Sequence, residues 1–484
     1  MLTTEAISFQ AITMELLVFA LGSILLLMKL IAKKGAVLPY GWITTLGLVV
    51  IGVVGVLYPP EISMTFNGMY YTDSYSLFFK EMILVCAVLI GLCSSEYVKQ
   101  KGYSEAEYYI LMVFATLGMM VFTSAGDLIT LYVGLELMTM SFIVLIGIIR
   151  HNALSSEAAI KYLVLSALSS AVMLYGMSLI YGFMGTTVFA AMAMNLYAFS
   201  GSALMVLGIL FFLAGFAYKL SAVPFHMWAP DIYQGAPTPV AGFLAVGAKV
   251  ATLGILCRLL FNFFIPFADS WLTVILALAM LSIIFGNLVA IPQRDVKRML
   301  AYSSIAQVGY LLLAVAAANT LGIVAICFYV AAYAFANIGA FIAASNVELS
   351  CGTTDMKKYA GMSKRSPLIA AALFIFMISL GGLPPTGGFI GKFIIFTSTI
   401  ESGYLIFSII ALLFSMVSVY YYLRLVRECY FAPVPEGADM TRIKTPIGIK
   451  IALAICMIMS IAMGLFFDPM VTAGAEALNG MLLF

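Results

Sequence analysis

The chain has 484 residues, of which 63% are hydrophobic and only 10% are charged, and its mean hydropathy is +1.10. This balance excludes a soluble globular domain and predicts a helical integral membrane protein. The net charge of +2 gives no reason to expect a nucleic-acid partner, and seven scattered cysteines without a CxxC pair predict no metal or iron–sulfur centre in this chain.

Fourteen apolar segments follow one another along the chain, and each reaches the roughly 20 residues that a helix needs to cross a bilayer. We therefore expect an all-α, polytopic membrane protein of about 14 transmembrane helices. The first segment has no basic leader and no small-residue cleavage site, so we expect a spanning helix and not a signal peptide. The expected helices cover approximately 8–32, 39–58, 74–97, 105–124, 127–149, 155–184, 203–228, 237–264, 270–291, 297–318, 321–347, 367–400, 403–430 and 446–466.

Basic residues in the connecting segments follow odd-numbered helices of this series, and the segments after even-numbered helices carry no Lys or Arg. The residues are Lys33, Lys34, Lys99, Lys101, Arg150, Arg294, Lys297, Arg298, Lys357, Lys358, Lys364, Arg365, Arg442 and Lys444. The positive-inside rule places these segments in the cytoplasm. It predicts a bacterial inner-membrane protein with both termini on the outer side.

Two of the expected helices are unusually long and interrupted. The seventh contains Lys219 and Pro224, and the twelfth contains GGLPPTGGFIGKF at 381–393. A proline inside a helix frees a backbone carbonyl, which water or a neighbouring group must satisfy. Because five helices separate the two, they run in opposite directions, which is typical of inverted repeats in transporters.

This placement predicts four parts of the chain. They are an N-terminal three-helix segment at 1–104, a five-helix repeat at 105–264, a second, inverted five-helix repeat at 270–430, and a C-terminal helix in 446–484.

Few charged residues fall near the middle of the expected helices: Glu136, Lys219, Lys249 and Lys392. A lysine at the bilayer centre costs about 2.5–3.5 kcal/mol on insertion scales, so it calls for a function. Burial favours the neutral amine, whereas a nearby carboxylate favours the ammonium. Moving or neutralising Glu136 would therefore switch Lys219 between holding and releasing a proton. The series predicts a proton relay with Glu136 as the partner of Lys219.

Lys161 and His226 are secondary candidates, and polar residues between the lysines would connect them through water. These connecting candidates are Ser221, His226, Tyr302, Ser303, Ser304 and Gln307.

Bland explanations also exist for several of these residues. A structural ion pair explains Glu136 and Lys219, although three buried lysines against one glutamate argue against packing as the only role. Lys161 near the interface can extend its charge to water, and His226 can cap the helix break. We expect Arg258 to extend towards the outer interface and the run Tyr420–Tyr422 to belong to an interfacial aromatic belt.

Four segments resemble a known family: SEAAIKYLVLSALSSAVMLYGMSLIYGFMGTT (155–187), KLSAVPFHMWAPDIYQGAPTPVAGFLAVGAK (219–249), RDVKRMLAYSSIAQVGYLL (294–312) and GGLPPTGGFIGKF (381–393). They are similar to the antiporter-like membrane subunits of respiratory complex I, the proton-translocating NADH:quinone oxidoreductase, which are related to Mrp antiporter subunits. The PDIYQGAPTPV run most resembles the N-type branch or its photosynthetic counterpart.

The resemblance implies a role for each candidate. Glu136 and Lys219 match the family's glutamate–lysine pair, Lys249 its central lysine and Lys392 its terminal lysine, while Lys161 falls on a lysine that relatives also carry. Gln307 stands where many relatives have a histidine, so a titrating group at that position is not expected here.

The resemblance also implies the partners. It implies a translocase subunit that moves protons while FMN, iron–sulfur clusters and quinone lie in other subunits. The expected contacts are a neighbouring antiporter-like subunit, small helical subunits and membrane lipid.

Three alternatives remain open at this point. The first is a subunit of a multi-subunit Na⁺/H⁺ antiporter. The second is a subunit of a quinone reductase that uses ferredoxin or another donor. The third is a structural membrane module whose buried charges only hold helices together.

Overall fold

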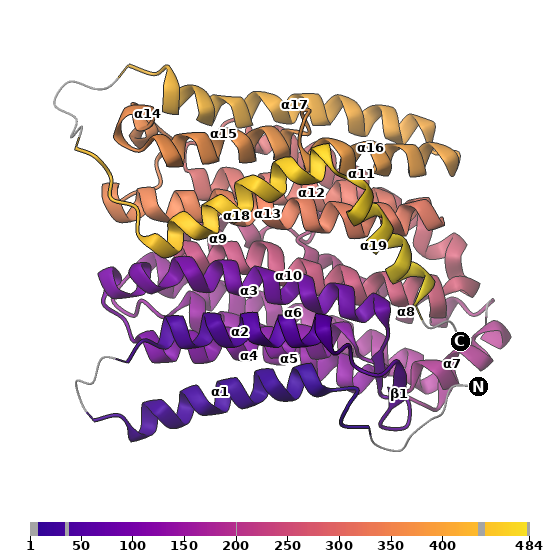
Figure 1. Cartoon of the computed structure of the whole chain (residues 1–484). Helices are drawn as coiled ribbons and strands as arrows, with labels where there is room; N and C mark the ends of the chain where they lie inside the picture. Colours follow the sequence, from indigo (N-terminus) through magenta and orange to yellow (C-terminus); the bar gives the residue numbers. More distant parts are fainter. Residues whose placement is uncertain (1–7, 34–37, 200, 434–440, 482–484) are drawn as a thin grey trace.

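Long helices that run side by side make up most of the structure, a computed structural model that describes residues 8–33, 38–199, 201–433 and 441–481 (Figure 1). The helices are α1 (Thr13–Ile31), α2 (Tyr40–Leu57), α3 (Ser74–Lys101), α4 (Glu105–Thr123), α5 (Leu128–Ile146), α6 (Ala153–Met184), α7 (Phe189–Asn195), α8 (Ala203–Leu220), α9 (Trp228–Gly235), α10 (Thr238–Arg258), α11 (Ala268–Ala290), α12 (Val296–Ala317), α13 (Thr320–Cys351), α14 (Met362–Arg365), α15 (Pro367–Gly381), α16 (Gly387–Glu401), α17 (Leu405–Tyr430), α18 (Ile447–Leu465) and α19 (Asp468–Asn479).

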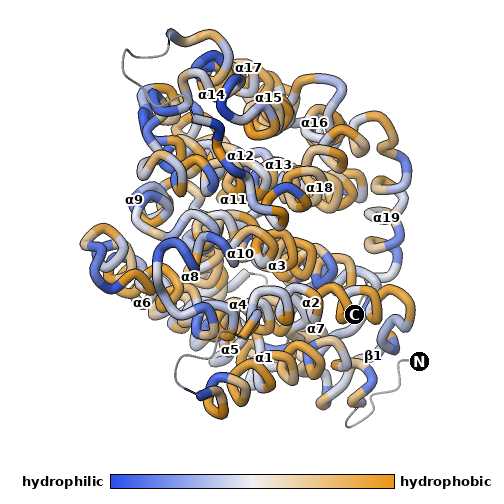
Figure 2. The backbone as a smooth tube through the Cα atoms, turned by 60° about the vertical axis from the view of Figure 1, so that its left-hand side comes forward, coloured by the Kyte–Doolittle hydropathy of each residue, from blue (hydrophilic) through white to orange (hydrophobic). Residues whose placement is uncertain are grey.

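The expected set of membrane-spanning helices is confirmed. Within the described ranges, 13 helices are long and apolar enough to cross a membrane, and the one remaining expected span, the twelfth (367–400), is divided into the shorter helices α15 and α16. Figure 2 shows that apolar residues dominate along the helices, while hydrophilic residues gather mainly where segments connect. The chain is therefore a polytopic membrane protein.

Several short elements were not expected from the sequence. They include α7, α14, α19 and an antiparallel hairpin of β1 (Ser63–Thr65) and β2 (Tyr70–Thr72). The hairpin is held to the segment between α4 and α5, because the Tyr71 amide donates to the Ser124 carbonyl at 2.8 Å. These elements are too short to give the 20-residue apolar signal on which the sequence analysis relied.

Both expected helix breaks are present. The helix α8 ends where Ser221 adopts a left-handed conformation (φ 56°), and α15 ends where Gly382 does so (φ 78°). Each break also contains a cis X–Pro bond, at Pro224 and Pro385. The expected end of the seventh helix at residue 228 is wrong, since its second half, α9, starts there and continues to Gly235.

The two five-helix units pack in the same way. In the first, α4 packs against α5 and α10, and α6 packs against α8. In the second, α11 packs against α12 and α17, and α13 packs against α15 and α16. Because each helix reverses the direction of the previous one, α4 and α11 start at opposite ends of the bundle. The units are therefore inverted repeats.

The basic connecting segments gather at one end of the bundle, on the left in Figure 1, and we call this the basic end. It holds the segments after α1, α3, α5, α11, α13 and α17. Lys34 lies outside the described residues. The hairpin, α7 and α19 lie at the opposite end, where α1 also begins (Figure 1).

Candidate functional site

Lys219 lies in the last turn of α8, directly before the first break, and its side chain is buried. Its ammonium Nζ donates to the Thr139 hydroxyl of α5 at 2.7 Å. The rings of Tyr162 and Tyr218 stand 5.9 and 5.7 Å from the same nitrogen. A hydroxyl and two aromatic faces thus replace part of the water that an exposed ammonium would bind.

Glu136 lies one turn before Thr139 on α5, so it is close to Lys219 without touching it. Its carboxylate Oε1 accepts a hydrogen bond from the Ser170 hydroxyl of α6 at 2.6 Å. A direct ion pair, the alternative explanation considered for Glu136 and Lys219, is not found among the described residues: Glu136 bonds to Ser170 and Lys219 bonds to Thr139.

Lys249 is buried in the middle of α10, and it too has hydroxyl partners in place of a carboxylate. Its ammonium donates to the Ser304 hydroxyl of α12 at 2.5 Å. That hydroxyl lies 2.9 Å from the Tyr333 hydroxyl of α13, which in turn donates to the Ala245 carbonyl at 3.0 Å. Hydroxyls both donate and accept, so this group can pass a proton between helices.

Gln307 continues the polar chain one turn further along α12. Its amide nitrogen donates to the Leu380 carbonyl at 2.9 Å and to the Tyr422 hydroxyl at 3.0 Å. Its amide oxygen accepts a hydrogen bond from Tyr329. The residue that departs from the family pattern therefore connects α12, α13, α15 and α17, although its amide cannot take up a proton at ordinary pH.

Lys392 lies in α16, after the second break, and its side chain returns to the end of α15. Its ammonium donates to the Leu380 carbonyl at 2.9 Å and to the Ser415 hydroxyl of α17 at 3.0 Å. The ring of Tyr310 is 4.7 Å away. Gln307 and Lys392 thus share the Leu380 carbonyl. A row of polar groups runs from Lys249 to Lys392, and its longest step is the one turn of α12 between Ser304 and Gln307.

The two secondary candidates have different surroundings. Lys161 has a side chain that is 41% exposed, and it pairs with Glu157 at 2.7 Å and Asp231 at 3.0 Å. Asp231 also pairs with Arg298 at 2.7 Å, so Lys161 belongs to an ion-pair network between α6, α9 and α12. His226 is buried in the first break, edge to face with Phe285, and it contacts none of the three buried lysines through an identified hydrogen bond.

Two expectations about the surroundings of the site were wrong. Arg258 does not extend to the interface, because it is fully buried and makes a two-pronged ion pair with Asp73 at 2.7 Å. Tyr421 and Tyr422 are fully buried, and only Tyr420 is exposed. A helix presents consecutive residues to different sides, so a run of three tyrosines cannot all face the interface.

Sequence reasoning also missed a carboxylate, Glu348, at the basic end of α13. It accepts hydrogen bonds from the Tyr97 hydroxyl at 3.1 Å, from Lys101 at 3.3 Å and from Thr238. The expected helix stopped at residue 347, whereas α13 continues to Cys351. Glu348 was therefore treated as part of a polar loop.

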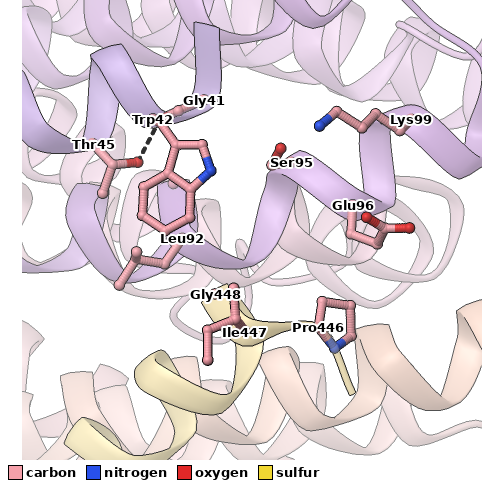
Figure 3. Close-up of a pocket in the computed structure, with 11 residues that line it drawn as sticks. Gly41, Trp42, Thr45, Leu92, Ser95, Glu96, Lys99, Pro446, Ile447 and Gly448 are labelled. Carbon is pink, nitrogen blue, oxygen red and sulfur yellow. Dashed lines mark hydrogen bonds between the residues drawn. The ribbon is translucent and has the colours of Figure 1, made fainter. Parts of the chain in front are cut away.

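A pocket at the basic end lies apart from the three buried lysines Lys219, Lys249 and Lys392 (Figure 3). It is formed by α2, α3 and the first turn of α18, and Trp42, Glu96 and Lys99 line it with Pro446. None of the six candidate site residues contributes to it. The buried polar chain, and not this pocket, is the candidate functional site.

Inverted five-helix repeats, two broken helices and a row of buried lysines together define an antiporter-like membrane protein. The chain belongs to the family described as NADH:quinone oxidoreductase/Mrp antiporter, TM, which matches residues 125–418. The resemblance found in the sequence is therefore confirmed.

Relatives with a specific subunit name match over nearly the whole chain. The chain is 42% identical to NADH-quinone oxidoreductase subunit N of Moorella thermoacetica, with 98% of each protein covered. It is 40% identical to the subunit of the same name of Desulforamulus reducens, with 98% of this chain and 99% of the relative covered.

Solved structures share the fold. A chain of respiratory complex I from Thermus thermophilus matches with a TM-score of 0.80 and 29% identity, covering 96% of this chain and 99% of that chain. A chain of an archaeal membrane-bound sulfane sulfur reductase matches with a TM-score of 0.85 and 26% identity, covering 98% of each. A chain of the Mrp complex from Dietzia sp. matches with a TM-score of 0.83 and 98% coverage of each, and at 19% identity it supports the fold alone.

Proposed function

We propose that this chain is a membrane subunit of a proton-pumping NADH:quinone oxidoreductase and that it carries protons through the buried lysines. The observation that carries the proposal is a row of buried polar groups: Lys249 donates to Ser304, and Gln307, one turn further along α12, shares the Leu380 carbonyl with Lys392. Buried lysines without an ion-pair partner add nothing to packing, so their cost is best explained by proton transfer. The names of the full-length relatives support the same assignment.

In this proposal Glu136 and Lys219 form the first station, Lys249 the central one and Lys392 the terminal one. Lys161 and His226 have secondary roles, Lys161 at the basic end and His226 within the first break. The two repeats, residues 105–264 and 270–430, supply one half of the route each. The segment 1–104 and the C-terminal part 446–484 flank them.

We place the basic end in the cytoplasm and both termini on the outer side of a bacterial inner membrane, because basic loops stay on the cytoplasmic side. The redox groups, FMN, iron–sulfur clusters and quinone, are assigned to partner subunits. Their redox reaction would change the contacts between subunits, and these changes would make the lysines of this chain bind and release protons. The proposed partners are a neighbouring antiporter-like subunit, small helical subunits and lipid.

The test is proton translocation by the complete complex in vesicles, compared with the electrons that it transfers. Lys219→Ala and Glu136→Ala should each lower the number of protons moved per electron while the complex stays assembled. If both variants pump with the unchanged ratio, the assignment of the relay is wrong.

The fold shared with the Mrp chain makes a subunit of a cation/proton antiporter the second candidate. Sodium-driven proton exchange in vesicles without quinone reductase activity would favour it. The subunits that copurify with the chain separate the two candidates and also identify the electron donor.

A further inference from the structure

The interface between α10 and α13 leads from the basic end to the central lysine. The two helices run side by side in opposite directions (Figure 1). At the basic end Thr238 of α10 donates to Glu348 of α13. Eleven residues further along α10, Lys249 reaches Ser304, whose hydroxyl meets Tyr333 of α13. One helix–helix interface therefore has a carboxylate at one end and the buried lysine at the other.

The face of α13 in this interface carries four polar residues. With 100° per residue, Glu348, Ser345, Asn337 and Tyr333 all fall within about 60° of one line along the helix. Phe341 lies on the same face, and it packs so closely on α10 that a Cβ added to the facing glycine would be 2.8 Å from its Cβ. The polar face is thus continuous except at Phe341.

A tyrosine from α9 lies at that gap. The ring of Tyr233 contacts the ring of Phe341 at 6.1 Å, and Tyr233 is fully buried. Its hydroxyl has no hydrogen-bond partner in the described protein, and the same holds for Ser345 Oγ and Asn337 Oδ1. Buried polar atoms are almost always hydrogen-bonded, and water is the usual partner where protein provides none. Three such atoms lie between Glu348 and the Ser304–Tyr333 pair.

The basic end of this interface has access to solvent. Lys101 is 3.3 Å from Glu348 and its side chain is 31% exposed, whereas the Glu348 side chain is 14% exposed. The ion pair with Lys101 stabilises the anionic carboxylate of Glu348 at a nearly buried position, where it can exchange protons with water and with Thr238.

We propose that Glu348 loads protons for Lys249, through a hydrated route along Ser345, Tyr233 and Asn337. The proton that Glu348 takes from water at the basic end moves by hydrogen-bond exchange to Ser304 and then to the neutral amine of Lys249, and Glu348 returns to its anionic form. This route reaches the central lysine without passing Lys219. The inference rests on the proposed function, because it gives the relay a second point of uptake.

The test uses the complete complex in vesicles and three variants. Tyr233→Phe removes one hydroxyl and keeps the ring that packs on Trp228 and Phe341. Glu348→Gln keeps the size of the side chain and one acceptor oxygen, replaces the other oxygen by an amide donor, and cannot bind a proton at ordinary pH. Glu107→Gln is the matched control, since Glu107 is also a carboxylate at the basic end, is 52% exposed and pairs only with Lys29 in the described structure.

We expect Tyr233→Phe and Glu348→Gln each to reduce the protons that this subunit moves per electron by at least about twofold, so that the ratio of the whole complex falls while electron transfer continues. Glu107→Gln should pump like the unchanged protein. A normal ratio in Tyr233→Phe overturns the route, and a normal ratio in Glu348→Gln overturns the loading role. If Glu348→Gln does not assemble, Tyr233→Phe alone decides the matter.

Lys219→Ala, measured in parallel, separates this inference from the proposed function. A lowered ratio in Lys219→Ala with normal ratios in Tyr233→Phe and Glu348→Gln overturns only the inference, and Glu348 is then a structural link between α3, α10 and α13. Normal ratios in all three overturn both.

Discussion

The two helix breaks free backbone carbonyls in the same way but satisfy them with different groups. At the first break the Trp228 indole N–H donates to the Tyr218 carbonyl at 2.9 Å. At the second break the amide of Gln307 and the ammonium of Lys392 both donate to the Leu380 carbonyl. A neutral ring donates at one break, whereas an amide and a buried lysine donate at the other.

This difference shows how the same lysine chemistry can be controlled in two ways. The charge of Lys392 is stabilised by the carbonyl end of α15, where the helix dipole favours a cation. Lys219 instead donates to the hydroxyl of Thr139 on α5, one turn from Glu136. We therefore expect proton binding by Lys219 to depend on whether Glu136 is charged. We expect proton binding by Lys392 to depend on the backbone geometry of the second break.

The largest effect is expected from Lys392. Lys392→Leu should slow proton transfer through this subunit by about 100-fold, the lower range for loss of an acid–base group, and it should lower the protons moved per electron. Lys392→Arg sharpens the comparison, because arginine keeps the charge and the donors for the carbonyls but does not release its proton. Normal pumping by Lys392→Arg would mean that the residue only closes the break.

A smaller effect is expected from the shape of the second break. A Cβ on Gly382 would meet the Lys392 side chain at 2.8 Å, and the residue has φ +78°. Gly382→Ala should cost about 1–2 kcal/mol of stability through backbone strain and should also lower the protons moved per electron. Gly185→Ala is the matched control, because Gly185 has φ +64° with nothing within 4 Å of an added Cβ.

Thermal unfolding and vesicle pumping of both glycine variants separate strain from displacement of the lysine. The two should lose similar stability, and only Gly382→Ala should pump less. Equal pumping by both would contradict a role of the break in holding Lys392.

The smallest effect is expected from Lys161. Its side chain is 41% exposed, and exposed ion pairs contribute about 1 kcal/mol or less. Lys161→Gln should change the unfolding temperature little and lower pumping less than about twofold. Lys29→Gln, equally exposed at 41%, is the control. A loss as large as that of Lys392→Leu would move Lys161 into the main relay.

Much of this arrangement could be predicted from the sequence, since hydrophobic length and basic loops determine helices in a membrane. The breaks were visible because proline and glycine act locally. The lysines stood out because charge at membrane depth is rare. Partners were harder to predict. Thr139, Ser170 and Trp228 are ordinary residues in an apolar sequence, and only packing brings them to the site.

Long-range pairs were missed for the same reason. Asp73 and Arg258 are 185 residues apart, so nothing local links them. Glu348 is joined to Tyr97 across 251 residues, and it stands at a helix end that hydropathy does not define sharply. Tyr422 was assigned to an aromatic belt because the sequence does not show which side of α17 faces the protein.

The most direct measurement is the number of protons moved per electron by the complete complex with Lys249→Met. Methionine is unbranched and only one atom shorter than lysine, so this substitution keeps most of the buried side chain and removes the central site for a proton. We predict that electron transfer continues in an assembled complex while fewer protons move per electron. An unchanged ratio would contradict the claim that protons pass through the buried lysines of this chain.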